Sequence, residues 1–269
     1  MGHSFLAFII VIGILVFIHE FGHFIVARLC RVGVEVFSLG FGPKIIQKKW
    51  GRTTYCVSAI PLGGYVKMVG EDPLTQVSPE DESASFTKKK LWQKSLIVAA
   101  GPVFNFLLAI FIFYLLYQFA GVYLAKPVVG EVMENSPALE AGLLPGDVVR
   151  EINTKKIESY EDIARIIGLG GGETLELVIE RDGQLMGRII TPMPSKGKNA
   201  FGEEIDKFII GIVGTGDVFH KRFNPVEAVG RALSDTWSIV NLTIVSVGKM
   251  INGSVSKDNL AGPLMIAQM

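Results

Sequence analysis

The sequence predicts an α-helical membrane protein with a small α+β domain inserted after its second apolar run. Of its 269 residues, 49% are hydrophobic, and the mean hydropathy of +0.40 exceeds that of an average soluble domain. Two apolar runs, at 4–28 and 95–121, are each about as long as a bilayer core requires. Segment 126–194 instead alternates short strand-like and helical patterns. The net charge of zero gives no general attraction to nucleic acid.

The first apolar run, from Ser4 to Arg28, contains the motif His19-Glu20-x-x-His23. The segment before it lacks the basic residues of a cleavable signal, and no cleavage site follows. We therefore predict a retained transmembrane helix over 1–30. Two imidazoles and a carboxylate at bilayer depth cost several kcal/mol, so they indicate a functional site, and a bound metal would offset that cost.

The spacing of the motif predicts its chemistry. His19 and His23 lie one helical turn apart and reach one ion together, whereas Glu20 is rotated by about 100° and suits a general base. This pattern is typical of zinc-dependent peptide hydrolysis, and a pair of structural histidines is the alternative. A catalytic zinc needs a third protein ligand. His3 lies at the opposite end of the helix and His220 lies outside the membrane, so the sequence supplies no third ligand.

Residues 31–94 form the loop between the two apolar runs. Basic residues crowd this loop, which predicts a cytoplasmic location. Segment 53–69 is rich in β-branched and aromatic residues, with a glycine pair near its middle, and predicts a short hairpin or edge strand. Segment 70–87 is expected to be a solvated connector. The spacing of Cys30 and Cys56 predicts two free thiols.

The second apolar run, 95–121, carries no charge and predicts a second transmembrane helix. Interfacial aromatic residues, Trp92 and Tyr123, lie at its two ends. If the loop between the runs is cytoplasmic, everything after Gly121 lies on the outer face.

Segment 126–194 predicts a small α+β domain. Ser136-Pro137 begins a short helix, Ser159 to Asp162 form a capping box, and Asp182-Gly183 is a hairpin turn. Residues 195–269 are expected to hold a polar linker and amphipathic or membrane-surface helices. For 234–251 a third membrane span is the alternative.

Six motifs together resemble the site-2 proteases, in particular bacterial zinc metalloproteases similar to the regulator of sigma-E protease. The resemblance covers essentially the whole chain. Its motifs are FIHEFGHFIVAR (17–28), SLGFGPKI (38–45), IPLGGYVKMVGE (60–71), AAGPVFNFLLA (99–109), a PDZ-like domain at 126–194 with SPALEAGLLPGDVVREIN, and GSVSKDNLAGPLMIA (253–267).

The resemblance implies a multi-pass protease of the bacterial cytoplasmic (inner) membrane that cleaves transmembrane segments of single-span proteins such as anti-sigma factors. It implies Zn²⁺ held by His19 and His23, with Glu20 as catalytic base. The loop 53–69 then becomes a membrane-associated β-hairpin that pairs with an unwound substrate through Gly63, Gly64 and Tyr65.

The resemblance also implies roles for two further features. Asn105 would contact substrate or the hairpin, with simple helix packing as the alternative. The PDZ-like domain would lie on the outer or periplasmic face and bind peptide ends, with a spacer role as the alternative.

One family feature is missing from this sequence. The family takes its third zinc ligand from a Leu-Asp-Gly motif in a later helix, and no Leu-Asp-Gly occurs here. We therefore expect a truncated chain that binds zinc weakly and cleaves poorly. A replacement ligand such as Asp235 or Asp258 is the alternative. A non-catalytic membrane adaptor that uses its PDZ-like domain is the second functional hypothesis, and a metal transporter is the third.

Overall fold

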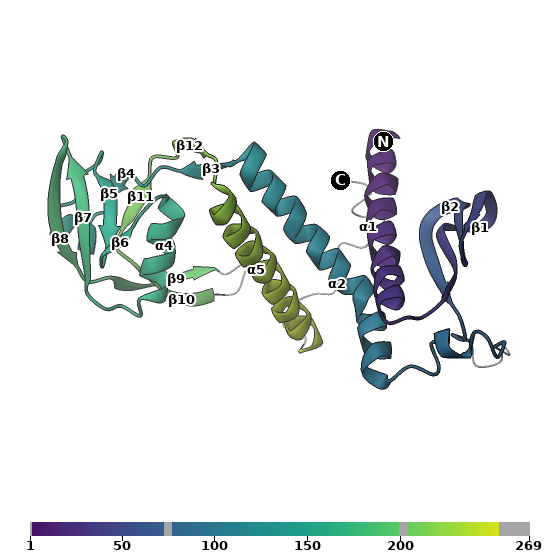
Figure 1. The fold of residues 1–269 in the computed structure, drawn as a ribbon. Coiled ribbons are helices and arrows are strands. Elements are labelled where there is room, and N and C mark those ends of the chain that lie inside the picture. The colour runs from purple at the N-terminus through teal and green to yellow at the C-terminus, as the bar shows by residue number, and fades with distance from the viewer. Residues whose placement is uncertain (1, 73–76, 199–203, 253–269) are drawn as a thin grey trace. The chain divides into compact units, whose positions relative to one another are not determined.

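The structure is a computed structural model that describes residues 2–72, 77–198 and 204–252. The chain divides into two compact units (Figure 1). Unit 1 comprises residues 1–114 and 229–269, and unit 2 comprises residues 115–228. The motif at 253–267, with Asp258, lies outside the described residues.

Two long helices, α1 (Gly2–Leu29) and α2 (Leu91–Leu115), are central to unit 1. Within the described residues, Leu6–Leu29 and Leu91–Ala120 are long and apolar enough to cross a membrane. The helices approach closely, since a Cβ atom on Gly22 would lie 2.6 Å from the Ala100 carbonyl oxygen. Both predicted spans are therefore helical. α2 begins four residues before the predicted start at 95, and the π-helical turn η2 (Leu116–Ala120) continues it.

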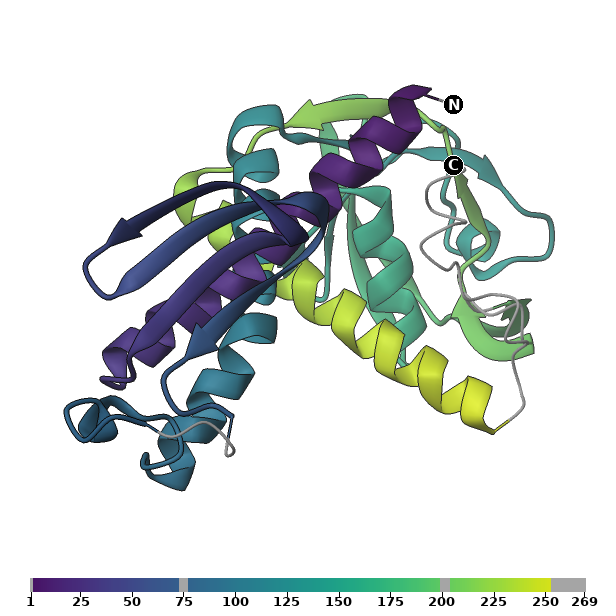
Figure 2. The ribbon, with the colours of Figure 1, turned by 90° about the vertical axis from the view of Figure 1, so that its right-hand side faces the viewer.

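Two long strands, β1 (Val34–Trp50) and β2 (Thr53–Met68), follow α1 and form one antiparallel hairpin (Figure 2). Segment 53–69 was expected to be a short hairpin or an edge strand. The short hairpin is corrected, because the chain turns at Gly51 and segment 53–68 is a single strand, whereas the edge-strand alternative agrees with the structure at 64–68. The glycine pair is accommodated by irregular register. With strands of 17 and 16 residues, unit 1 is also less helical than the sequence predicted.

The hairpin curls so that β1 contacts both halves of β2. Val36 is the partner of Thr54 on one side and of Lys67 on the other, while Trp50 is the partner of Thr53. Segments 44–50 and 64–68 therefore form the two outer edges of this sheet.

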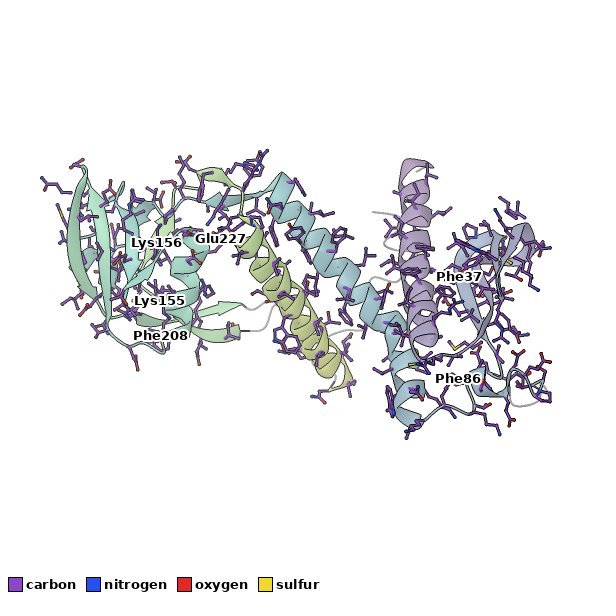
Figure 3. The ribbon with its side chains drawn as sticks, viewed as in Figure 1. Phe37, Phe86, Lys155, Lys156, Phe208 and Glu227 are labelled. Carbon is purple, nitrogen blue, oxygen red and sulfur yellow. The ribbon has the colours of Figure 1, made fainter. Side chains whose placement is uncertain are left out.

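The core of unit 1 lies where α1, the hairpin and the start of α2 meet. Phe37 is buried there, between the rings of Phe17 and Phe24 (Figure 3). Cys30 and Cys56 are buried free thiols, as predicted. The outer surface of α1 instead exposes a row of apolar side chains: Leu6, Ile10, Val11, Ile14 and Phe17.

Unit 2 is an α+β domain larger than the predicted 126–194. Its four-stranded sheet has the order β6-β5-β7-β8, formed by β5 (Val148–Ile152), β6 (Lys155–Lys156), β7 (Leu175–Arg181) and β8 (Gln184–Ile190). Three strand pairs surround it, β3 (Val122–Ala125) with β12 (Val218–Lys221), β4 (Val129–Val132) with β11 (Ile212–Gly214), and β9 (Met193–Lys198) with β10 (Glu204–Ile209).

The polar segment after 194 is therefore not the expected linker, because β10, β11 and β12 complete the domain. Ile210 is 2% exposed and belongs to the same core as Val149 and Leu177. The period-2 pattern of these strands is short and interrupted by glycines, which hid it in the sequence.

The local signals within unit 2 are confirmed. Helix α3 (Pro137–Glu140) is capped by Ser136, whose hydroxyl accepts from the Leu139 amide. Helix α4 (Tyr160–Leu169) begins with the predicted capping box of Ser159 and Asp162. Asp182 and Gly183 both have positive φ, as a two-residue hairpin turn of type I′ requires.

Two elements remain. A short 3₁₀ turn, η1 (Glu82–Ala84), lies in the connector before α2. Helix α5 (Pro225–Ile251) lies within 195–269, where helices were expected, and it is absent from the two candidate spans found among the described residues.

Candidate metal centre

The two histidines of the motif converge on one point beside α2. Their Nε2 atoms lie 3.2 Å apart, and their ring centroids are 4.9 Å apart. Two nitrogen ligands at about 2.0–2.1 Å from a tetrahedral zinc are separated by about 3.3 Å. The spacing of the two Nε2 atoms therefore fits a shared ion.

A backbone carbonyl of α2 orients His23. The Nδ1 atom of His23 lies 2.7 Å from the Ile97 carbonyl oxygen. Because a carbonyl only accepts, Nδ1–H must donate, which leaves a lone pair on Nε2 for the metal. Metal-bound histidines almost always have such a partner on the second nitrogen. Sequence reasoning missed this contact because a carbonyl carries no side-chain signal.

Asn105 of α2 lies against the other nitrogen of His19. Asn105 Nδ2 is 3.4 Å from His19 Nδ1, and Asn105 Oδ1 is buried without a hydrogen-bond partner. A half-turn of the amide exchanges these atoms, and Oδ1 then accepts from His19 Nδ1–H. Both imidazoles would then present Nε2 lone pairs. Asn105, predicted to contact substrate or the hairpin, thus lies against His19, a predicted zinc ligand.

Gly101 leaves room beside the two imidazoles. A Cβ atom there would lie 2.5 Å from His19 Nε2 and closer still to His23 Nε2. The Gly101-x-x-x-Asn105 pattern thus places both its ends on the face of α2 that meets the histidines. The missing side chain keeps open the space that an ion between the imidazoles would need.

The catalytic-base candidate Glu20 lines a pocket of about 270 Å³ together with His23. Gly64 and Tyr65 of β2 line the same pocket, so two of the predicted substrate-binding residues lie beside the motif. Gly63 instead packs under the ring of Phe41. Sequence reasoning gave no role to Glu71, whose carboxylate also lines the pocket and accepts from the Met68 amide at 3.1 Å.

The described residues contain no cluster of three or more metal-ligating side chains. His220 belongs to unit 2, where its Nε2 atom lies 2.6 Å from the Ala120 carbonyl oxygen. Asp235 forms an ion pair with Arg231 at 3.3 Å. Two converging imidazoles, an oriented tautomer and a vacant glycine position nevertheless fit zinc.

A second concave site, of about 500 Å³, lies in unit 2 between α4 and segment 207–212. Its lining includes the apolar side chains of Ile163, Ile167 and Phe208, the last visible in Figure 3. The Tyr160 hydroxyl donates to the Ile212 carbonyl oxygen at 2.9 Å, and burial raises the pKa of this hydroxyl. The site can take an extended apolar segment.

Comparison with known proteins identifies the family to which the chain belongs. The model of peptidase family M50 matches residues 7–269. A candidate zinc metalloprotease of Agrobacterium fabrum is 38% identical over 97% of this chain and 73% of its own length. A candidate zinc metalloprotease of Campylobacter jejuni is 34% identical over 99% of this chain and 71% of its own.

Solved structures that resemble part of the chain include PDZ domains of SdrC-like proteins. That of Listeria monocytogenes is 20% identical, with a TM-score of 0.26, over 33% of this chain and 85% of its own. That of Listeria innocua is 22% identical, with a TM-score of 0.27, over 36% and 99%. From the family match and the relatives, this chain belongs to peptidase family M50, a family of membrane zinc metalloproteases.

Proposed function

We propose that this protein is an intramembrane zinc endopeptidase that cleaves transmembrane segments of other membrane proteins, such as anti-sigma factors. The observation that carries the proposal is the position of the motif. His19, Glu20 and His23 lie within the candidate span Leu6–Leu29, next to the second span. A polar cluster at that depth suits a substrate that is itself embedded in lipid.

His19 and His23 would hold the zinc, whose chemistry there would be the activation of water and the polarisation of the scissile carbonyl. The carboxylate of Glu20 accepts the proton from the attacking water and then delivers it to the leaving amine. Ile97 and Asn105 hold the two imidazoles through their Nδ1 atoms. The lipid-facing helices around these residues limit the access of bulk water.

The outer edge of the hairpin sheet gives the substrate a place to bind in extended form. Segment 64–68 has β1 on one side only, and Gly64, Tyr65 and Val66 line the pocket with Glu20 and His23. A helical peptide bond is shielded by its own hydrogen bonds. A substrate strand added to this edge would expose that bond beside Glu20.

We further propose that the groove of unit 2 binds peptide ends, as expected for a PDZ-like domain on the outer or periplasmic face. The groove combines apolar side chains with two basic residues, Lys196 and Lys207. These side chains suit an extended chain end with its terminal carboxylate. Peptides that end in a free carboxylate should bind more tightly than their amides, as measured by fluorescence polarisation with the whole chain.

Glu20→Gln separates catalysis from metal binding. The protein is reconstituted in vesicles with a single-span substrate, and its zinc content is measured by mass spectrometry. We expect the unsubstituted chain to bind zinc weakly and to cleave slowly. Against that baseline, Glu20→Gln should lose cleavage and keep zinc, and His23→Ala should lose both. Glu158→Gln, which removes an exposed carboxylate of unit 2 paired with Lys221, is the matched control and should keep both.

The alternative is a non-catalytic adaptor that acts through the groove of unit 2. It predicts peptide binding without cleavage, and a cellular activity that Glu20→Gln leaves unchanged. Loss of that activity in a groove variant such as Ile163→Asp, with no loss in Glu20→Gln, would favour the adaptor. The reverse result supports the peptidase.

A further inference from the structure

A pocket unrelated to the metal centre lies at the end of α1, against the tip of the hairpin. It has a volume of about 510 Å³, and its lining includes Phe24, Ile25, Arg28, Trp50, Arg52 and Tyr55. All six residues belong to unit 1. The lining combines two guanidinium groups with three aromatic rings, and neither the catalytic chemistry nor the proposed substrate edge at 64–68 uses it.

The position of this pocket follows from α1. Arg28 lies in the last turn of that helix, where the candidate span Leu6–Leu29 ends. Its guanidinium carbon lies 5.9 Å from the centre of the Phe24 ring. The apolar floor of Phe24 and Ile25 thus faces the acyl-chain depth, while Arg28 marks the depth of the headgroups.

The hairpin brings the second half of the site to the same depth. Trp50 is 80% exposed at the tip, which is costly in water but favourable at a membrane interface. Tyr55 packs edge-on against Phe24, with ring centroids 6.0 Å apart. Lys48 is the cross-strand partner of Tyr55 and adds a further positive charge on that face of the sheet.

The charge balance of the pocket is positive. Arg52 forms an ion pair with Asp81, yet its side chain remains 60% exposed. A guanidinium has five donors, so Arg52 can hold the carboxylate and still donate to a second acceptor. The single carboxylate of Asp81 balances only one of the three positive charges of Arg28, Arg52 and Lys48, so the net charge is positive. Planar guanidinium groups of this kind bind phosphate oxygens well.

We propose that this pocket binds the phosphate of an anionic phospholipid headgroup, with the acyl chains lying along Phe24 and Ile25. The lipid would fasten the hairpin tip to the end of α1 and so hold the sheet against the membrane. The proposal rests on the membrane placement of α1 in the proposed function, and it adds a specific ligand to that placement.

Trp50 supplies the probe for the test. The chain has three tryptophans, so Trp92→Phe with Trp237→Phe leaves Trp50 alone. This protein is reconstituted in phosphatidylcholine vesicles that contain a small fraction of either brominated phosphatidylglycerol or brominated phosphatidylcholine. We expect stronger quenching of Trp50 by the brominated phosphatidylglycerol at equal mole fraction.

Paired substitutions identify the groups responsible. The double variant Arg28→Gln with Arg52→Gln should abolish the preference for phosphatidylglycerol. Each substitution should lower the affinity for the anionic lipid about fivefold. Lys88→Gln with Lys89→Gln removes the same amount of charge from the segment before α2, away from the pocket, and should keep the preference. Zinc binding by each variant confirms that unit 1 is folded.

Three outcomes would overturn the proposal. Equal quenching by the two brominated lipids would show that the tip is in the membrane without a headgroup site, leaving the proposed function intact. Quenching by neither lipid would contradict the membrane placement itself. Displacement by glycerol 3-phosphate as effectively as by phosphatidylglycerol would assign the pocket to a soluble phosphate compound.

Discussion

Asn105 Nδ2 lies 3.4 Å from Nδ1 of His19, while Oδ1 of the same amide is buried with no hydrogen-bond partner. A buried amide oxygen without a hydrogen-bond partner lowers the stability of the folded state. A hydrogen bond from His19 Nδ1–H would satisfy this oxygen. When that bond forms, His19 is fixed in the tautomer that binds a metal through Nε2. We therefore propose that Asn105 orients His19, a proposed zinc ligand.

Substitution of Asn105 should first change metal affinity. We expect Asn105→Leu to weaken zinc binding about 10- to 100-fold, since it removes the acceptor for His19. Asn105→Asp keeps an acceptor and should retain most of the affinity. Cobalt titration followed by visible absorption measures this without any turnover. If Asn105 contacted only substrate, KM would rise in Asn105→Leu while the cobalt titration stayed unchanged.

Gly101 should be equally sensitive, for a steric reason. In Gly101→Ala the new methyl group would lie 2.5 Å from His19 Nε2, so the imidazoles must separate. We expect the variant to lose zinc while both helices stay folded by circular dichroism. Gly13→Ala is the matched control, because a Cβ atom at Gly13 meets nothing within 4 Å. Zinc binding by Gly101→Ala at the wild-type level would exclude an ion between the two imidazoles.

The sequence predicts those site residues that lie close together in one segment, and it does not predict those that come together only through packing. His19 and His23 are one helical turn apart in one segment, so their convergence follows from helix geometry alone. Gly64 and Tyr65 reach the same pocket from β2, whose segment was predicted as a short hairpin or edge strand without its pairing to β1. The Ile97 carbonyl and Glu71 could not be assigned, since both depend on how separate elements pack.

A substitution at Gly64 should restrict the access of substrate to Glu20 and leave metal binding unchanged. A Cβ atom at Gly64 would lie 3.0 Å from Cγ of Glu20 and 2.8 Å from the Ser38 carbonyl oxygen. We therefore expect Gly64→Ala to lower kcat/KM on a membrane substrate about tenfold, by roughly 1.4 kcal/mol, with zinc content unchanged. Gly187→Ala, on a strand where a Cβ atom meets nothing within 4 Å, should match the wild type.

In unit 2, features set by neighbouring residues were predicted from the sequence, and the pairing of distant strands was not. The caps at Ser136 and Ser159 and the turn at Asp182 are set by neighbouring residues, and each was predicted. The pairing of β4 with β11, about 80 residues apart, leaves no local trace. The segment containing Ile210 was consequently assigned to a linker, although its side chain completes the core.

The ion pair between Asp147 and Arg181 should make the stability of unit 2 depend on acid. Arg181 Nε lies 2.7 Å from Asp147 Oδ1, the side chain of Asp147 is 1% exposed, and the Leu144 amide donates to Oδ2 at 2.9 Å. Burial alone would raise the pKa of Asp147, but the hydrogen bonds from Arg181 and Leu144 outweigh it and lower that pKa. The folded state thus holds its proton more weakly than the unfolded state, whose aspartate pKa is about 3.9.

The stabilisation is therefore fully present above the unfolded pKa and is lost as pH falls through the lower folded pKa. We expect Asp147→Asn to destabilise unit 2 by about 2–3 kcal/mol at neutral pH, since it leaves Arg181 without its anion. Hydrogen exchange of β5 and β7, corrected for intrinsic rates, measures this. The part of the protection that depends on acid should vanish in the variant.

Glu180→Gln is the control, because it breaks the more exposed ion pair with Arg150. It should lower the stability of unit 2 by about 1 kcal/mol or less. If the stability of Asp147→Asn still fell with acid as in the wild type, the acid dependence would belong to another carboxylate.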